Sequence, residues 1–489
     1  MHPSASTRPA DPARQHGLLP AWGVAELPAP PPFSPRNVLR TVGPGIIGLG
    51  IAIGSGEWLL GPSVVARYGP ALLWVTTVSV LLQVFLNIEM ARYTMYTGEP
   101  VTVGFMRTRP GPAFWSAVYG LLTFLQIGWP GWALASATAS AALILGRIPS
   151  GADVLLVKLV GYVTFGACVV ILAVGRKVER NLEFAMWILM AVVFGYLLVI
   201  DLTMVSGESW RAIAGGFVSF GALPSGGDWF LLGAFAAYSG LGGMSNAFMT
   251  NWMRDKGFAM GATVGYIPAA GGEHVALSPQ GNVFVVDRQS LARWNNWFRY
   301  LNVDQWAIFA VGSVAGMLLV TLMSLEFVPR GTEVSGWAVA NLQATALADR
   351  HGRIFWYLTL LTGFWVLFKT QLGNSDGLVR SLTDMLWCGN RRVRRSCGGE
   401  VRTVYYSILA VFVVWGCIAL NLAQPLTLVV IGANVAGLNF VVVSLHTLVL
   451  NRRYLPPELR PALWREGMVV LCALFFGAFM LATIVNWVS

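Results

Sequence analysis

Charge is scarce in this chain: only 11% of its 489 residues are Asp, Glu, Lys or Arg, while 55% are hydrophobic. Soluble domains usually contain about 25% charged residues. The mean hydropathy of the sequence is +0.62. This composition excludes an ordinary soluble protein. It predicts an integral membrane protein, with the lipid bilayer as its main partner and no room for a separate soluble domain.

Cysteine pairs and catalytic motifs are lacking as well. The sequence has five cysteines and no CxxC pair, so disulfides and structural zinc are not expected. It has no HxxH, HExxH or Walker-type motif and no paired catalytic carboxylates. Nothing in the sequence therefore predicts an enzyme or a bound cofactor.

What the sequence does contain is a series of long apolar runs. Each run has about 20 residues, which is enough for an α-helix to cross a hydrocarbon core of about 30 Å. We therefore expect an all-α integral membrane protein with eleven transmembrane helices. The predicted spans lie near residues 43–66, 71–91, 113–141, 152–174, 182–203, 229–252, 305–325, 353–385, 402–420, 426–450 and 466–488.

The positions of the basic residues predict the orientation of these helices. With the N-terminus inside, 24 of the 33 Lys and Arg residues fall in inner segments and six in outer segments. Positive residues are retained on the cytoplasmic side of a membrane. The net charge of +10 is thus explained without a nucleic-acid partner. We expect a cell inner-membrane protein with a cytoplasmic N-terminus, a C-terminus outside, and a disordered cytoplasmic tail over residues 1–40.

The first predicted span is interrupted by Gly54-Ser55-Gly56-Glu57. Glycine is a poor residue for a helix interior, and an ionised carboxylate in mid-membrane costs about 2.5–3.5 kcal/mol on insertion scales. Such a carboxylate normally faces a cavity, an ion or a partner charge. The segment predicts a broken helix with a polar site, although a kinked helix whose glutamate bonds a neighbouring helix is the alternative.

The sixth predicted span is interrupted in a similar way, by Ser239-Gly240-Leu241-Gly242-Gly243-Met244-Ser245-Asn246. Paired interruptions at corresponding positions are typical of inverted-repeat transporters, whose half-helix ends form the substrate site. We therefore expect a first five-helix repeat over residues 41–204 and a second over residues 205–450. The second repeat includes a cytoplasmic loop (254–304), and residues 451–489 hold a connecting loop and an extra C-terminal helix.

The first two spans resemble the natural resistance-associated macrophage protein (Nramp) family of proton-coupled divalent metal transporters. The resemblance is clearest over residues 43–100. It implies the LeuT-type fold, a 5+5 inverted repeat with broken helices 1 and 6, and commonly eleven helices. The residues that carry it are Gly43-Pro44-Gly45, Ile53-Gly54-Ser55-Gly56-Glu57-Trp58, Ala66-Arg67-Tyr68-Gly69, Leu72-Leu73-Trp74 and Gln83.

The chain departs from this family at the metal site. Where the family has Asp-Pro-Gly-Asn, this chain has Gly54-Ser55-Gly56-Glu57, so Glu57 takes the place of the asparagine. The family's Met-Pro-His aligns with Gly243-Met244-Ser245, and the acidic pair of the third span is missing. The resemblance is therefore to a divergent, Nramp-related branch without an intact site for soft metals.

The remaining donors predict a site made mainly of oxygen atoms. Oxygen ligands suit hard cations such as Mg²⁺ or Mn²⁺, and Glu57 with Met244 are the candidate metal ligands. The rival interpretation is that half-helix N–H groups hold an organic carboxylate. The predicted substrate-binding residues are Gly54, Ser55, Gly56, Glu57, Gly240, Gly243, Met244, Ser245 and Asn246.

Lys369 in the eighth span is a possible charge partner for this site. We hypothesise that it pairs with Glu57, and pairing with Asp376 is the alternative. Asp376, Arg380 and Asp384 recur at helical spacing and predict an ion-pair ladder near the cytoplasmic end. On the tenth span, Asn439 is a candidate for coupling, and His446 either carries a proton or is simply hydrogen-bonded.

Together these features predict a secondary active transporter that moves a divalent metal cation by alternating access, with H⁺ as a candidate coupling ion. The small inorganic cation is then substrate and not cofactor. The alternative function is a LeuT-type carrier for a small organic solute such as an amino or carboxylic acid. A channel or receptor is a third class, which two broken helices disfavour.

Overall fold

The computed structural model describes residues 17–173, 178–270, 272, 275–332 and 341–488, and this part of the chain is helical almost throughout. Within it, the strands are β1 (Gly23–Val24) and β2 (Asn282–Val283), which pair in parallel. The long uninterrupted helices are α5 (Trp74–Thr97), α9 (Val154–Ala173), α10 (Val178–Met204), α17 (Arg353–Gly389), α19 (Val401–Ala419), α20 (Pro425–Tyr454) and α21 (Leu463–Val488).

The other predicted spans are composite. They comprise α3 (Pro44–Ser55), η1 (Gly56–Leu60) and α4 (Gly61–Tyr68); α7 (Pro112–Ile127) and α8 (Gly131–Leu145); α12 (Trp229–Tyr238) and α13 (Met244–Lys256); and α14 (Arg288–Asn302), η5 (Val303–Ala310) and α15 (Val311–Phe327). The shorter elements are α2 (Pro35–Thr41), α6 (Val101–Met106), α11 (Gly207–Gly216), α16 (Leu342–His351), α18 (Arg391–Ser396), η2 (Pro70–Leu73), η3 (Gly151–Asp153), η4 (Ala259–Thr263) and η6 (Pro457–Leu459).

Within the described residues, each predicted apolar run is largely helical. Among the described residues, eight helical stretches are long and apolar enough to cross a bilayer. Two of the remaining runs are divided, as α7–α8 and α12–α13, and the third, α17, is rich in polar residues. The count of eleven spans therefore stays a prediction.

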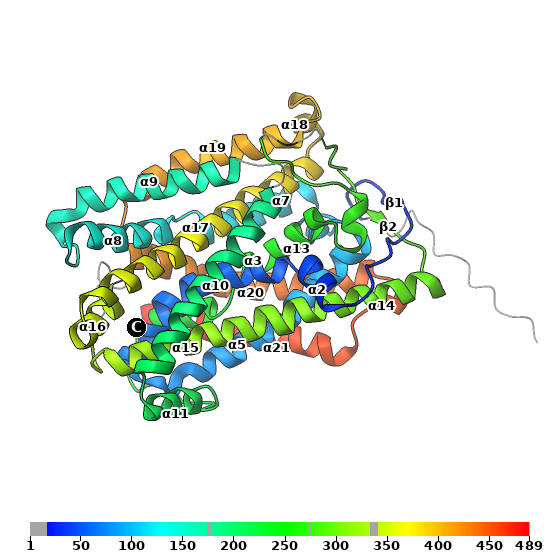
Figure 1. Ribbon diagram of the computed structural model, residues 1–489. Coiled ribbons are helices and arrows are strands. Elements are labelled where there is room, and N and C mark those ends of the chain that lie inside the picture. Colours follow the sequence, from blue (N-terminus) through cyan, green and yellow to red (C-terminus); the bar gives the residue numbers. More distant parts are fainter. Residues whose placement is uncertain (1–16, 174–177, 271, 273–274, 333–340, 489) are drawn as a thin grey trace, which may run out of the picture.

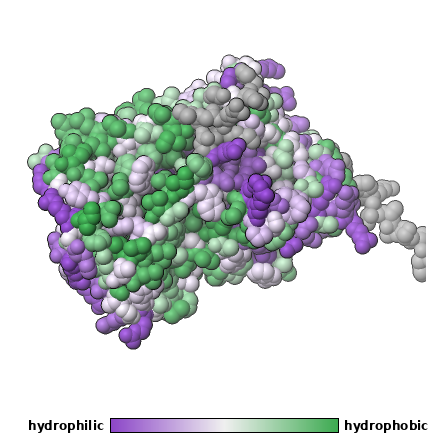
Figure 2. All heavy atoms as spheres, in the orientation of Figure 1, coloured by the Kyte–Doolittle hydropathy of each residue, from purple (hydrophilic) through white to green (hydrophobic). Residues whose placement is uncertain are grey.

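The helices run roughly side by side, and the connecting segments gather at two opposite ends (Figure 1). One end holds β1, β2, α14 and α18, and the other holds α11, α16 and the C-terminal end of the chain. Figure 2 shows apolar residues over the middle of one face and hydrophilic residues toward its two ends. This distribution is that of a protein with a lipid-facing belt between two aqueous surfaces.

The expectation of a disordered tail is wrong for residues 17–40, while residues 1–16 lie outside the described residues. This N-terminal segment pairs with β2, and Glu26 lies 2.5 Å from Arg293 of α14. The Trp297 indole of α14 donates to the Pro28 carbonyl at 2.8 Å, and Trp22 is buried beneath the Arg107 guanidinium. These contacts offset the conformational entropy that the segment loses when it becomes ordered, which its Pro- and Ala-rich composition alone would not do.

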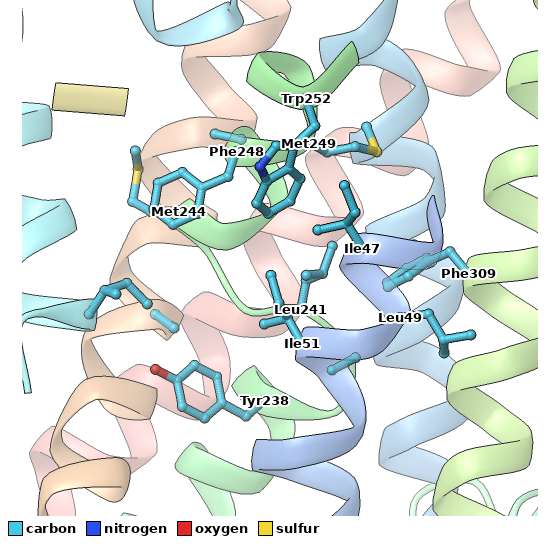
Figure 3. Packing of buried hydrophobic residues seen from close by; sticks show 14 of the residues in the cluster. Ile47, Leu49, Ile51, Tyr238, Leu241, Met244, Phe248, Met249, Trp252 and Phe309 are labelled. Carbon is cyan, nitrogen blue, oxygen red and sulfur yellow. The ribbon is translucent and has the colours of Figure 1, made fainter. Parts of the chain in front are cut away.

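The centre of the bundle is formed by α3, the two halves of the sixth span, and α17. Figure 3 shows Leu241, between α12 and α13, beside the α3 residues Ile47 and Ile51. A Cβ atom at Gly48 of α3 would lie 3.0 Å from the Leu241 side chain, so glycine allows this close approach. The two interrupted spans therefore pack directly against each other.

Candidate functional site

The first interruption is a π-helical turn and not unwound chain. After α3 ends at Ser55, η1 continues the helix, and the Gly61 N–H donates to the Gly56 carbonyl five residues earlier. Single π-turns inside α-helices often occur at functional sites, because they redirect side chains without breaking the backbone. This turn carries Glu57, which is fully buried.

Gly54, near the end of α3, and Gly56, the first residue of the turn, are both required by close packing. A Cβ atom at Gly54 would lie 1.7 Å from the Thr370 hydroxyl of α17, and one at Gly56 would lie 1.9 Å from the Tyr238 carbonyl oxygen. No side chain fits at either distance. The glycines thus bring Glu57 between α17, the sixth span and α15, where a Cβ at Gly316 would be 3.7 Å from the glutamate Cγ.

By hydrogen-bond geometry, neither carboxylate oxygen of Glu57 has a partner among the described residues, although the Gly240 backbone N–H is near enough to stabilise the carboxylate. Lys369 is close enough to interact with Glu57 electrostatically, but its ammonium donates to the Gly50 carbonyl of α3. The structure shows no direct ion pair of Lys369 with Glu57 or with Asp376 in its described part. Lys369 is therefore a charged neighbour of Glu57 whose hydrogen bond goes to the backbone.

The second interruption is a true break between α12 and α13. Gly240, Gly242 and Gly243 have φ angles of 107°, 90° and 48°. These left-handed values favour glycine. Five residues consequently leave the helix, from Ser239 to Gly243, and their backbone groups need partners from elsewhere.

Two glutamines supply many of those partners. Gln83 of α5 accepts from the Leu241 N–H at 2.9 Å and donates to the Ser239 carbonyl at 2.7 Å. Gln126 of α7 accepts from the Met244 N–H at 2.9 Å and donates to the Gly242 carbonyl at 2.8 Å. Of the predicted substrate-binding residues, Met244 therefore has its backbone N–H bonded within the protein.

The predicted site residues of α13 join the same amide network. Asn246 donates to Asn87 at 2.8 Å. Ser245 donates to Asn374 of α17 at 3.1 Å. Asn439 of α20 donates to Gln126 at 2.7 Å. The side-chain amide oxygens of Asn246 and Asn439 have no hydrogen-bond partner in the described part of the chain.

Met244 and Glu57 are the two predicted metal ligands. Met244 is part of the buried hydrophobic cluster. No group of three or more His, Cys, Asp or Glu side chains is placed to hold a metal ion within the described residues. Any cation bound at Glu57 would have this one carboxylate, neutral oxygens and retained water as ligands.

Toward the end of the bundle that holds α14 and α18, a buried ion network joins α13 to α17. Arg254 lies 2.5 Å from Asp384 and 2.6 Å from Asp255, and Arg380 pairs with Asp255 and, at 2.8 Å, with Asp376. The predicted ladder is confirmed for Asp376 and Arg380. It is wrong for Asp384. The second partner of Arg380 is Asp255, and Asp384 pairs with Arg254 instead.

Toward the opposite end, a half-exposed ion pair joins the two interrupted spans. Arg67 at the end of α4 lies 3.2 Å from Asp228, which caps the N-terminus of α12. The pair lines a cavity of about 220 Å³ between α4, α12 and α20. Glu57 thus lies between the buried ion network toward one end of the bundle and the Arg67–Asp228 pair toward the other.

His446 of α20 is a hydrogen-bonded histidine. Its two ring nitrogens lie 2.8 Å from the Thr108 hydroxyl and 2.7 Å from the Tyr119 hydroxyl. Phe105 stacks on the ring at 4.3 Å between centroids. The imidazole therefore joins α6, α7 and α20, away from Glu57.

Sequence reasoning missed most of the amides that hold the centre. Gln83 entered only through the family resemblance, and Asn87, Gln126, Gln305 and Asn374 did not enter at all. A signal was present, because an uncharged amide in mid-span is costly unless bonded, and Gln83 and Asn87 share one helix face at four-residue spacing.

No protein-family model and no curated protein matches this sequence. Among solved structures, two single-residue variants of a manganese transporter from Eremococcus coleocola each match with a TM-score of 0.62 and 15% identity, covering 95% of this chain and 90% of that chain. The same transporter bound to an aromatic bis-isothiourea substituted compound matches with a TM-score of 0.59 and 15% identity, covering 94% and 89%. The chain has the fold of that transporter. The predicted LeuT-type fold is confirmed, while the helix count and the repeat boundaries stay predictions.

Proposed function

We propose that the chain is a secondary active transporter that moves a divalent metal cation across the cell inner membrane by alternating access. The observation that carries the proposal is Glu57, a fully buried carboxylate without a hydrogen-bond partner among the described residues, on a π-turn at the centre of this fold. An acidic group at this depth is expected to meet a cation or a proton during its working cycle. The likeness to a manganese transporter supports a metal as substrate.

The donor set favours a hard cation that keeps part of its hydration shell. Glu57 supplies one negative charge, and the side-chain amide oxygens of Asn246 on α13 and Asn439 on α20 are further buried oxygen atoms without a partner in the described part of the chain. Mg²⁺ dehydrates reluctantly and is commonly held by one or two carboxylates together with water. Mg²⁺ or Mn²⁺ is therefore the proposed substrate, and H⁺ is the proposed coupling ion.

The two ends of the bundle support alternating access. In this proposal the buried network of Arg254, Arg380 and three aspartates closes the transport path at one end, and the Arg67–Asp228 pair closes it at the other. An occluded site between two polar closures is what a carrier needs and what an open pore lacks. In this proposal each closure opens in turn while the other stays shut.

A carrier for a small organic acid is the second candidate, and Lys369 is the observation that favours it. A fixed ammonium next to Glu57 repels a dication and can stand in for one. However, an organic carboxylate needs free half-helix N–H groups. Those of Leu241 and Met244 are already bonded to Gln83 and Gln126. The metal therefore remains the favoured substrate.

The test is uptake into proteoliposomes of Mg²⁺ and Mn²⁺ against a panel of amino and carboxylic acids. Saturable metal uptake is expected in the wild type and in Lys369→Met, and it should be absent in Glu57→Gln because the neutral amide keeps the shape of the side chain but not its charge. Lys158→Met, a lysine change on α9, is the matched control and should behave as wild type. Competition by organic acids alone, with no response to either metal, would refute the proposal.

The proposed orientation places the N-terminus and the end with α14 and α18 in the cytoplasm. It is supported by the excess of basic residues in the segments predicted to lie inside. In a cysteine-free background, Asn390→Cys should be protected from an impermeant thiol reagent in intact cells, while Arg330→Cys should be labelled. The reverse pattern would overturn this orientation.

A further inference from the structure

An open apolar groove runs along the outside of the bundle between α7 and α20, away from Glu57. Its volume is about 440 Å³. It lies on the protein surface, and Leu445 and Val449 in its floor are 48% and 51% exposed. The lining residues are Thr108, Arg109, Trp115, Val441, Val442, Leu445, His446, Val449 and Arg453.

The floor of the groove has a regular spacing. Val441, Leu445, Val449 and Arg453 recur every four residues, so they form one stripe along α20. The stripe is about 18 Å long at the rise of an α-helix. One leaflet of a hydrocarbon core is about 15 Å thick. The stripe is therefore long enough to accompany one acyl chain from the bilayer surface to its midplane.

Two arginines stand at one end of the groove. Arg109 and Arg453 are both exposed. Neither has an acidic partner in the described part of the chain, although nearby arginines do: Arg452 lies 2.6 Å from Glu466, and Arg107 lies 2.5 Å from Glu99. The groove thus has an apolar floor along the span and uncompensated positive charge where the span ends.

We propose that this groove binds an anionic phospholipid, with its phosphate at Arg109 and Arg453 and one acyl chain along the α20 stripe. Basic pockets between membrane helices on the cytoplasmic side are the usual receptors for anionic headgroups. Trp115 beside the arginines is placed as indole rings are at a membrane interface. A free phosphate would leave the apolar stripe unused, so the lipid is the occupant that matches both parts of the groove.

The bound lipid would brace three elements. The His446 ring forms one wall of the groove, and its hydrogen bonds reach Thr108 and Tyr119. A chain lying over this wall keeps water away from the buried hydrogen bonds that join α6, α7 and α20. Lipid binding should therefore raise the unfolding temperature of the protein.

The test compares lipids on purified full-length protein in detergent. Titration with phosphatidylglycerol and phosphatidylcholine, read by native mass spectrometry and by thermal unfolding, should show about a thirtyfold preference for phosphatidylglycerol, since each of the two basic residues contributes about fivefold near anionic lipid. Arg109→Gln with Arg453→Gln should abolish the preference. The double change Arg391→Gln with Arg392→Gln removes the same charge from α18 and should leave the preference intact.

A second variant tests the acyl-chain half of the proposal. Leu445→Trp fills the groove without changing charge, so it should weaken binding of both phosphatidylglycerol and phosphatidylcholine. Three outcomes would overturn the proposal: an undiminished preference after loss of both groove arginines, equal loss in the α18 control, or equal stabilisation by inorganic phosphate alone. The last result would indicate a simple anion site.

Discussion

The two interrupted spans have similar sequences and different structures. The first has glycines at positions 54 and 56 and remains helical through a π-turn, whereas the second has glycines at positions 240, 242 and 243 and leaves the helix over five residues. The first keeps its backbone hydrogen bonds within the helix. In the second, backbone groups form hydrogen bonds with Gln83 and Gln126 on neighbouring helices.

This difference separates two tasks. A helix that keeps its own hydrogen bonds needs no outside partners, so the π-turn can leave Glu57 without a hydrogen-bond partner among the described residues. An unwound segment in the membrane is tolerated only where the protein satisfies its polar groups. The first span therefore presents a buried carboxylate, and the second is a fixed wall held by amides.

The largest effect on stability is expected where that wall is held. Gln83→Leu and Gln126→Leu each remove the acceptor of a buried N–H group, that of Leu241 or Met244. Each change should lower the free energy of unfolding by about 1–3 kcal/mol, and the double variant by about 2–6 kcal/mol. Chemical denaturation of purified protein in detergent measures the difference.

Gln289→Leu is the matched control, because Gln289 is exposed on α14. This change should alter the free energy of unfolding by no more than about 0.5 kcal/mol. If the two buried variants unfold like the control, the sixth span is held by contacts other than these amides, and the contrast between the two spans loses its basis.

The positions of both interruptions followed from the sequence, because glycine and carboxylate residues in mid-span conflict with a plain apolar helix. The sequence did not indicate that the first interruption is a π-turn and the second an unwound segment. Whether a glycine-containing span bulges or unwinds depends on partners far away in sequence, such as Gln83 and Gln126 for the sixth span. Hydropathy identifies a span, but it carries no information about which amides will face it.

The same limit applies to the charged groups. Helical spacing was sufficient for the Asp376–Arg380 pair, which lies on one helix. It was insufficient for Asp384, whose partner Arg254 lies on another helix. The order of residues 17–40 also depends on remote surfaces, since their contacts are with α14 and the α6–α7 region. Local patterns were reliable here only where the interaction itself was local.

A smaller effect is expected from tightening the π-turn. Gly56→Ala would place a Cβ atom 1.9 Å from the Tyr238 carbonyl, and backbone at that position cannot rotate away. The overpacking should cost about 1–3 kcal/mol of unfolding free energy. Gly195→Ala on α10 is the control, because its Cβ would meet nothing within 4 Å, and it should instead stabilise the protein by about 0.4–1 kcal/mol. Equal melting temperatures for the two variants would show that the spans are less closely packed than the structure indicates.

The smallest effect is expected where the two spans meet at the end of the bundle that holds α11 and α16. Arg67 of α4 and Asp228 of α12 are each about 40% exposed, so water and salt screen their attraction. Arg67→Gln should therefore lower the free energy of unfolding by at most about 1 kcal/mol. That loss should disappear in about 1 M NaCl, where the screening length is only about 3 Å.

Arg211→Gln on α11 controls for net charge, because Arg211 has no ion pair among the described residues, and it should change stability at neither salt concentration. A larger loss for Arg67→Gln that persists in high salt would mean that this pair, and not the packing of glycines against the backbone, joins the two interrupted spans.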